Sequence, residues 1–137
     1  MRILGIDYGQ KRIGLALSDP LGFTAQSLKT LVRQNKEQVL RDLVLICAEH
    51  GVQEVVIGLP INMNGTVGPK AKEILGLIPK MENRLKVPVK TWDERLTSKQ
   101  AGRLMIEEGL SRQKQRSNSD RLASILILQS YMESKRL

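Results

Sequence analysis

Three acidic residues stand at positions from which their side chains could converge on one site. Asp7 closes the apolar run of residues 2–6. Glu94 follows a short β-type run that ends at Asp93, and Asp120 stands near the start of the last helical stretch. In a sheet with crossover helices, functional side chains gather beyond the carboxyl ends of the parallel strands. We therefore expect Asp7, Glu94 and Asp120 to lie together.

Clustered carboxylates repel one another unless a cation lies between them. The sequence holds one cysteine, Cys47, and one histidine, His50, so it is poor in soft metal ligands and cannot form an internal disulfide. Oxygen ligands favour Mg²⁺ or Mn²⁺, and one or two such ions activate water and stabilise the leaving oxygen in displacements at phosphorus. The residues thus predict metal-dependent hydrolysis of a phosphodiester bond.

The charge balance agrees with a polyanionic partner. The sequence has 22 Lys and Arg against 14 Asp and Glu, a formal net charge of +8, and phosphates are attracted to such a field and release counterions on binding. Charge alone does not decide the matter, because many small basic proteins bind nothing acidic. The four aromatic residues, Tyr8, Phe23, Trp92 and Tyr131, are too few to suggest a base-stacking platform for single strands.

The elements that would position these residues are those of an α/β fold. Three strands joined by short turns come first and form an antiparallel meander. Helices then alternate with short β-branched runs, which are typical of buried parallel strands. The predicted strands are residues 2–6, 12–18, 24–31, 54–58 and 87–93, and the predicted helices are 35–50, 69–85, 97–108 and 119–133.

Several residues are expected to interrupt, start or connect these helices and strands. Pro79 is expected to break or kink the helix over 69–85, and Thr97 with Gln100 forms a capping-box pattern at the start of the next one. Residues 112–116 are predicted to be a basic loop before the last helix. The long loop over residues 60–68 either shapes a substrate groove or is simply solvated.

We expect one domain that spans residues 1–137, because no repeat or Pro/Gly/Ser-rich linker divides the sequence. The first apolar run is too short for a signal peptide, and no window approaches the ~18 apolar residues of a membrane span. A soluble, cytoplasmic protein with no membrane partner is the expectation.

Four stretches together resemble one family, YqgF/RuvX, whose members are described as Holliday junction resolvases and as nucleases that mature the precursor of 16S ribosomal RNA. The resemblance covers nearly the whole chain. The stretches are Gly5-Ile6-Asp7-Tyr8-Gly9-Gln10-Lys11-Arg12-Ile13-Gly14, then Ile57-Gly58-Leu59-Pro60 with Asn62-Met63-Asn64-Gly65-Thr66, then Asp93-Glu94-Arg95-Leu96-Thr97-Ser98, and Asp120-Arg121-Leu122-Ala123-Ser124 with Ile127-Leu128-Gln129. The sequence has Asn64 where the family usually has Asp, and Ser124 where it usually has a second Ala.

The resemblance implies an RNase H-like fold: a five-stranded mixed sheet of strand order 3-2-1-4-5, flanked by helices, in the chain order βββαβαβαα. It assigns catalysis and the binding of one or two Mg²⁺ or Mn²⁺ ions to Asp7, Glu94 and Asp120. It implies a hydrolase that acts on nucleic acid, with 5′-end maturation of pre-16S rRNA in ribosome biogenesis favoured over resolution of branched DNA in recombination and repair.

Each assigned residue also has a purely structural interpretation. Asp7 could end a strand before the Gly9 turn, Glu94 could be a solvated loop residue, and Asp120 could be a helix cap, since Ser117, Asn118 and Ser119 precede it. Lys11, Arg12 and Arg95 are candidates for contacts with substrate phosphates, although exposed basic side chains usually do nothing specific.

Other functions remain open from the sequence. A nucleic-acid-binding module could keep this fold without catalysis, but all three acidic positions are occupied here. The opening Gly5-Ile6-Asp7-Tyr8-Gly9 also resembles the phosphate-binding start of two-lobed ATPases of the actin and sugar kinase type, which need a second lobe. The oligomeric state, monomer or homodimer, would separate an RNA nuclease from a junction resolvase, because a resolvase needs two opposed sites.

Overall fold

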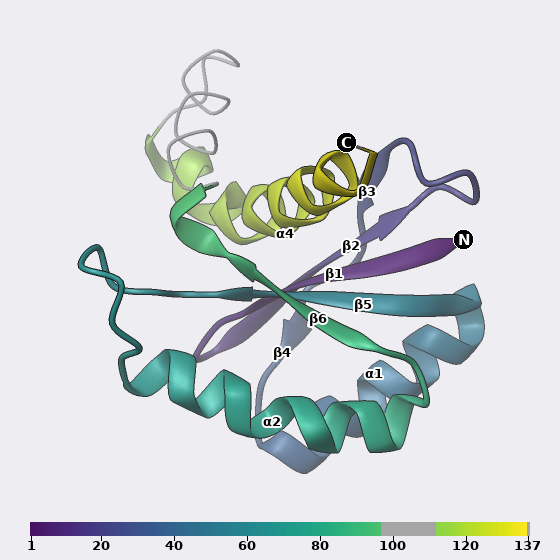
Figure 1. The fold of residues 1–137 in the computed structure, drawn as a ribbon, viewed down its shortest axis with the longest axis horizontal. Coiled ribbons are helices and arrows are strands. Elements are labelled where there is room, and N and C mark those ends of the chain that lie inside the picture. Colours follow the sequence, from purple (N-terminus) through teal and green to yellow (C-terminus); the bar gives the residue numbers. More distant parts are fainter. Residues whose placement is uncertain (97–111, 137) are drawn as a thin grey trace.

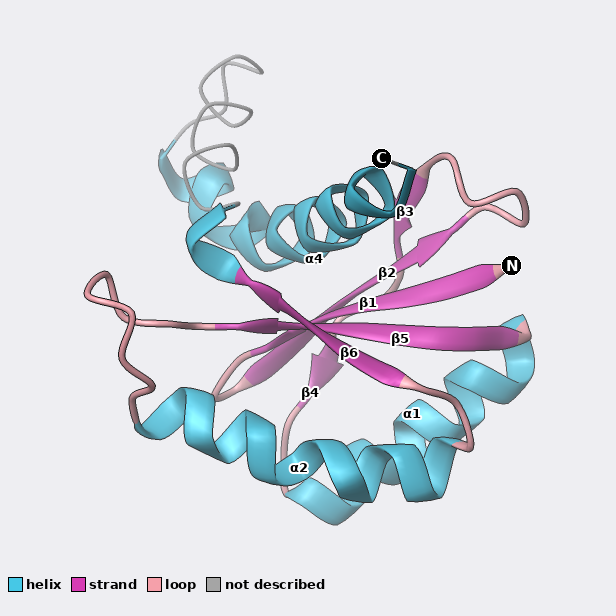
Figure 2. Cartoon of the chain, in the orientation of Figure 1, coloured by secondary structure: helices cyan, strands magenta, loops and turns pink. Residues whose placement is uncertain are grey.

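The computed structural model describes residues 1–96 and 112–136, with side chains described for residues 1–96 and 122–135. In this part of the chain a mixed sheet separates two helical layers (Figures 1 and 2). The strands are β1 (Arg2–Tyr8), β2 (Arg12–Ser18), β3 (Ala25–Ser27), β4 (Leu31–Val32), β5 (Val52–Leu59) and β6 (Val89–Asp93). The helices are α1 (Lys36–His50), α2 (Pro69–Leu85), the 3₁₀ turn η1 (Glu94–Leu96) and α4 (Arg112–Arg136).

The strands follow the order β3-β2-β1-β5-β6, with β4 also beside β2. β1 pairs antiparallel with β2 and parallel with β5, and β5 pairs parallel with β6. The predicted order 3-2-1-4-5 is therefore confirmed. The predicted third strand over residues 24–31 is instead two short strands, because one extra residue is accommodated between the Ala16–Ser27 and Ile13–Leu31 pairings, as in a bulge.

Alternation along β1 sends successive side chains to opposite faces of the sheet. Leu4, Ile6 and Tyr8 join the larger core cluster, which also contains the buried residues of α1 and α2. Ile3 joins the smaller cluster with Ile127 and Leu128 of α4. Gly5 and Asp7 share the face of Ile3, so Asp7 lies on the α4 side of the sheet.

The two helices of the larger layer begin and end much as the sequence predicts. Asn35 and Gln38 form a capping box at the start of α1, and Gly51 ends it in the left-handed conformation at φ 64°. Of the break or kink expected at Pro79, the break is wrong, because α2 runs from Pro69 to Leu85 without interruption. Pro79 is exposed, so the backbone bond that it cannot make is lost on the solvent side of the helix.

The start of α4 is a second correction. The predicted basic loop over residues 112–116 is helical, and residues 117–119 lie inside the helix rather than at its start. Arg, Gln and Lys have high helix propensity, so the helix that docks on the sheet extends through them. The predicted helix over residues 97–108 lies outside the described residues.

Close contacts fix α4 on the sheet. A Cβ at Gly5 would lie 2.8 Å from Leu128 Cβ and 3.1 Å from the Ser124 carbonyl oxygen, so only glycine allows this approach. At the other end of α4, Glu54 of β5 accepts hydrogen bonds from the Tyr131 hydroxyl at 2.9 Å and from Lys135 Nζ. Among the described helices, none is both long and apolar enough to cross a membrane.

Candidate functional site

Asp7 and Glu94 lie together at one end of the sheet, which we call the carboxylate edge. Asp7 is the next-to-last residue of β1, and Glu94 is the first residue of η1, directly after β6. β1 and β6 each pair in parallel with β5, which lies between them, so the carboxyl ends of both strands reach the same edge of the sheet. A hydrogen bond joins the two carboxyl groups across β5.

Gly58 of β5 makes this meeting possible. It pairs with Trp92 of β6 and stands one residue beyond Ile57, the partner of Ile6 in β1. A Cβ at Gly58 would lie 2.9 Å from Glu94 Cγ and Oε1, and 2.6 Å from Ile127 Cδ1. The absent side chain therefore leaves the space in which Glu94 reaches over β5 towards Asp7.

The surroundings of Glu94 disfavour its negative charge. Burial raises its pKa to about 7, helped by the charge of Asp7 and by the hydrogen bond to Asp7, while Lys70 of α2 lowers it. Two carboxyl groups in contact ionise together only at a cost in energy. Near neutral pH the Glu94 carboxyl group therefore still holds a proton for part of the time, and a cation could take the place of that proton.

The third predicted acid is only partly described. Asp120 belongs to α4, but its side chain lies outside the described residues. Among the side chains that the structure does describe, no group of three or more Asp, Glu, His or Cys could hold a metal ion. The structure thus brings two of the three predicted acids together and leaves the third as an expectation.

The predicted basic residues lie at or near the same edge. Lys11 is exposed in the turn after β1 and Arg12 is exposed at the start of β2, where residues 9–12 line a shallow hollow of about 290 Å³. Arg95 follows Glu94 and binds Asp93 through hydrogen bonds of 2.8 to 3.2 Å. Arg95 holds the pKa of Asp93 below its ordinary value, so part of its charge is already matched. Lys70, close enough to affect Glu94, was not predicted.

A second cluster supports the carboxylate edge from the opposite face of the sheet. Arg33 donates to the Gly9 carbonyl at 3.2 Å, forms an ion pair with Glu73 of α2, and lies 4.6 Å from the centre of the Tyr8 ring. The Arg33 backbone N–H also donates to the Lys11 carbonyl at 2.8 Å. These contacts fix the turn that follows Asp7. Sequence patterns did not predict them, because the three elements involved are distant along the chain.

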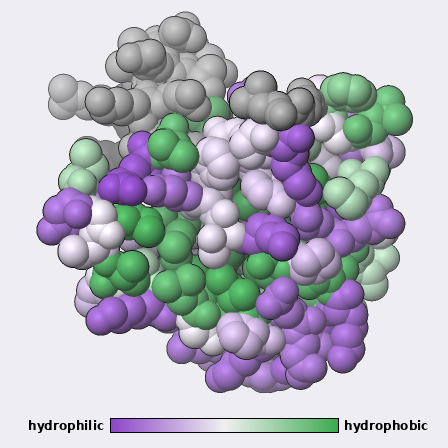
Figure 3. Space-filling view, viewed as in Figure 1, coloured by the Kyte–Doolittle hydropathy of each residue, from purple (hydrophilic) through white to green (hydrophobic). Residues whose placement is uncertain are grey.

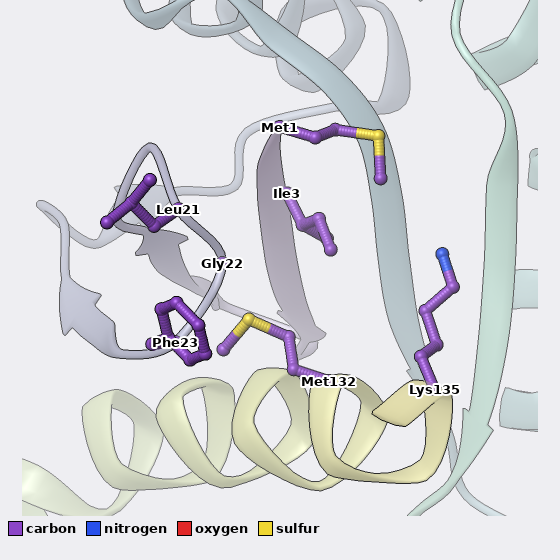
Figure 4. Close-up of a pocket in the computed structure, with 7 residues that line it drawn as sticks. All are labelled: Met1, Ile3, Leu21, Gly22, Phe23, Met132 and Lys135. Carbon is purple, nitrogen blue, oxygen red and sulfur yellow. The ribbon is translucent and has the colours of Figure 1, made fainter. Parts of the chain in front are cut away.

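Other reactive or hollow features lie away from the carboxylate edge. Cys47 is buried in α1, where burial raises its thiol pKa to about 11, as expected for a packing residue. Figure 4 shows an apolar hollow of about 300 Å³ at the opposite end of β1, between Leu21, Phe23 and Met132. Figure 3 shows hydrophilic surface over the lower helices and apolar surface across the middle of the same view. None of these features adds a group to the site.

Comparison with known families and proteins covers almost the whole chain. The family described as RuvX, Holliday junction resolvase, matches residues 1–134. A protein of Clostridium acetobutylicum, provisionally named a pre-16S rRNA nuclease, is 48% identical over 134 residues, which are 98% of this chain and 99% of that protein. A protein of Clostridium botulinum with the same name is 49% identical over 133 residues, 97% of each chain.

Two solved structures share the fold. RuvC of Thermus thermophilus, in complex with a Holliday junction substrate, has a TM-score of 0.60 and 20% identity, covering 99% of this chain and 96% of that chain. The Holliday junction resolvase of fowlpox virus has a TM-score of 0.62 and 18% identity, covering 98% and 99%. Together with the strand order, they confirm the predicted RNase H-like fold.

Proposed function

The chain belongs to the RuvX family, and from this premise we propose that it is a metal-dependent nuclease whose active site is the carboxylate edge. The observation that carries the proposal is the hydrogen-bonded pair of Asp7 and Glu94, held over Gly58 with a Glu94 pKa of about 7. A buried carboxyl group whose pKa is raised this far beside a second carboxyl group is typical of a site that performs chemistry.

Asp120 is proposed as the third acidic residue. α4 approaches β1 where Ser124 and Leu128 meet Gly5. From that contact Asp7 lies two strand residues, about 7 Å, towards the carboxylate edge. Asp120 lies four helix residues, about 6 Å, in the same direction. The backbone of Asp120 is thus level with Asp7, which supports a shared site.

The donor chemistry fits a divalent cation. Asp7 and Glu94 offer only carboxylate oxygens, which are the ligands that Mg²⁺ and Mn²⁺ prefer. Asp7, Glu94 and Asp120 would hold one or two such ions, which when bound activate water and stabilise charge at the phosphate. The absence of a side chain at Gly58 leaves room for Glu94 to reach Asp7, and the positive charge of Lys70 offsets part of the negative charge of the pair.

Substrate contacts are proposed for the basic residues beside the pair. Lys11 and Arg12 are exposed on a turn that Arg33 holds in place, so they are presented at a fixed distance from Asp7. Arg95, oriented by Asp93, lies on the other side of the pair. Exposed Lys and Arg at such positions bind backbone phosphates without reading sequence.

The favoured substrate is precursor 16S ribosomal RNA, cut during 5′-end maturation in the cytoplasm. Support comes from relatives with 45–49% identity that carry this provisional name over nearly their full length. The family description favours a second candidate, resolution of a Holliday junction. That reaction requires a two-fold dimer to place two sites on opposed strands, whereas an RNA nuclease can act as a monomer.

Cleavage assays with Asp7→Asn test the proposed function. A pre-16S rRNA fragment and a four-way DNA junction are incubated with wild type or variant in Mg²⁺, Mn²⁺ or EDTA. We expect wild-type cutting of the RNA with metal, a loss of about a thousandfold or more in Asp7→Asn, and retained nucleic-acid binding. Asp42→Asn, on α1, is the matched control and should cut normally.

Each other outcome changes the assignment. Metal-dependent cutting of the junction alone, by a dimer, would make the chain a resolvase. Binding of both substrates without cutting in any metal would make it a non-catalytic module. Full activity of Asp7→Asn would remove the carboxylate edge as the active site.

A further inference from the structure

The loop between β5 and α2 carries the most exposed large apolar side chain of the described residues. Met63 is 86% exposed, ahead of Leu21 at 77%. Figure 1 shows this loop, residues 60–68, projecting from the end of β5 at the carboxylate edge. A single exposed apolar residue needs no function, so the setting of Met63 decides how it is interpreted.

Internal hydrogen bonds hold the loop in one conformation. The Asn62 backbone N–H donates to the Thr66 carbonyl at 3.0 Å, and the Gly65 N–H donates to the Asn62 carbonyl at 2.8 Å. The side chains of Asn62 and Asn64 both bond to Thr66, and Gly65 has φ 85°. The polar side chains are thus used inside the loop, whereas Met63 faces water on a preorganised support.

The loop also lies beside the strand end that leads to Glu94. It starts after Leu59, which pairs with Asp93. Arg95 Nη1 lies 3.9 Å from the position of a Cβ on Gly65, and Asp93 holds the same guanidinium. Met63 therefore lies on a loop whose base adjoins the strand end that leads to Glu94.

The aromatic residues are all engaged elsewhere. Tyr8 and Tyr131 are buried, and Trp92 is half-buried with its ring 6.5 Å from that of Tyr131. Phe23 lines the hollow at the opposite end of β1 (Figure 4). A protein that must hold a base out of its stack also uses Met, Leu or Ile as an apolar wedge, and Met makes favourable contacts with aromatic rings.

We propose that Met63 is a wedge that contacts an unstacked base beside the phosphate to be cut. The ligand is a nucleobase of the substrate, from RNA or from branched DNA, turned out of its stack and packed on the Met63 side chain. This inference rests on the proposed nuclease function. It adds a specificity residue that selects substrates with an unpaired base next to the cleavage site.

The test compares Met63→Gln, of nearly equal length but polar, with Met63→Leu, which keeps an apolar side chain. Leu21→Gln is the matched control, since it changes the next most exposed large apolar residue of the described part of the chain, at the far end of the sheet. The probes are an RNA duplex and a DNA four-way junction, each with one unpaired 2-aminopurine, and fully base-paired RNA and DNA duplexes of the same sequence. Binding is measured in the Asp7→Asn background, and cleavage in the active protein.

We expect 2-aminopurine fluorescence to rise when the protein binds a probe with an unpaired base. Met63→Gln should abolish this rise and weaken binding to that probe about five- to tenfold. Its effect on the paired duplexes should be less than twofold. Met63→Leu and Leu21→Gln should behave as the parent protein. Whether the RNA or the junction responds identifies the source of the base.

Two results would overturn the inference in distinguishable ways. If the wild type cuts its substrate and Met63→Gln matches it in binding, fluorescence and cleavage, then the wedge is wrong while the nuclease stands. If the wild type neither binds nor cuts any of these probes or the pre-16S rRNA fragment in Mg²⁺ or Mn²⁺, the proposed function fails and the wedge fails with it.

Discussion

The two faces of the sheet at the carboxylate edge are built in opposite ways. On the α4 face, glycines at positions 5 and 58 leave room for helix backbone and for Glu94. On the other face, Tyr8 is 2% exposed and lies under Arg33, which is itself held by Glu73. One face is thus kept empty for acidic side chains, and the other is filled with bulky, paired groups.

The difference teaches how one strand can serve two purposes. Asp7 and Tyr8 are neighbours in β1, and strand alternation sends one to each face. The packed face fixes the backbone through Tyr8 and the Gly9 turn, so that the open face can hold two carboxyl groups that repel each other. Substitutions on the open face should therefore change catalysis and metal binding, and those on the packed face should change stability.

Gly58→Ala should have the largest effect of the three variants that test this comparison. The new methyl group would meet Glu94 and Ile127 at under 3 Å, so Glu94 must move, and misplacement of a reacting group by about 1 Å costs on the order of 100-fold in rate. Cleavage kinetics and thermal melting measure both consequences. Gly76→Ala, in α2 with open space around it, is the control and should keep full activity. Normal kcat in Gly58→Ala would show that Glu94 needs no fixed position.

The second prediction, of intermediate size, is that ionisation of Glu94 makes the stability of the folded protein depend on pH. Its folded pKa is raised from 4.5 to about 7, so its contribution to stability is complete below pH 4.5 and is lost as pH rises through 7. Because Glu94 is partly exposed, the free energy of unfolding of the metal-free protein should fall by on the order of 2 kcal/mol over this window. The free energy of unfolding of Glu94→Gln should not fall in this way. Since metal must displace the proton, Mn²⁺ affinity should fall about tenfold per pH unit below 7.

Urea unfolding and calorimetric titration with Mn²⁺, each at pH 5.5 and 8, measure these effects. Added Mn²⁺ should restore stability at pH 8 and have little effect at pH 5.5. Equal Mn²⁺ affinity at both values would contradict the assignment of the shared proton to the carboxyl pair.

Tyr8→Phe should have the smallest effect and the opposite sign. The Tyr8 hydroxyl is buried and has no hydrogen-bond partner among the described residues, so its removal relieves a desolvation cost of about 1 kcal/mol. The ring and its contact with Arg33 remain. Thermal melting should show an unchanged or slightly higher Tm, with normal cleavage. A clear fall in Tm would mean that the hydroxyl has a partner after all.

Local patterns predicted the elements whose signals lie within a few residues. The helical spacing of apolar residues over residues 35–50 and the β-branched run of β5 are such signals. The break predicted at Pro79 does not occur. The energetic cost of a proline inside a helix depends on which side of the helix faces solvent, and that side is set by the tertiary structure. The start of α4 was missed because residues 117–119 favour a helix start locally, while the high helix propensity of Arg, Gln and Lys extends the helix through residues 112–116.

The candidate site was predictable as a set of acids but not as a geometry. Strand ends placed Asp7 and Glu94 at one edge, and their hydrogen bond agrees with that expectation. The role of Gly58 depends on a side chain that crosses from the next strand, and the role of Arg33 depends on a turn and a helix far along the chain. Spacing in one sequence carries no signal for such contacts.

The packing of α4 across β1 and β2 has a consequence for the order of events during synthesis. A ribosome makes β1 before α4, so the sheet face that carries Asp7 and Glu94 stays open to water until α4 has been made. Glu54 gains its partners Tyr131 and Lys135 at that same late moment. A nascent chain that lacks α4 therefore holds a nearly complete sheet whose carboxylate-bearing face is still uncovered.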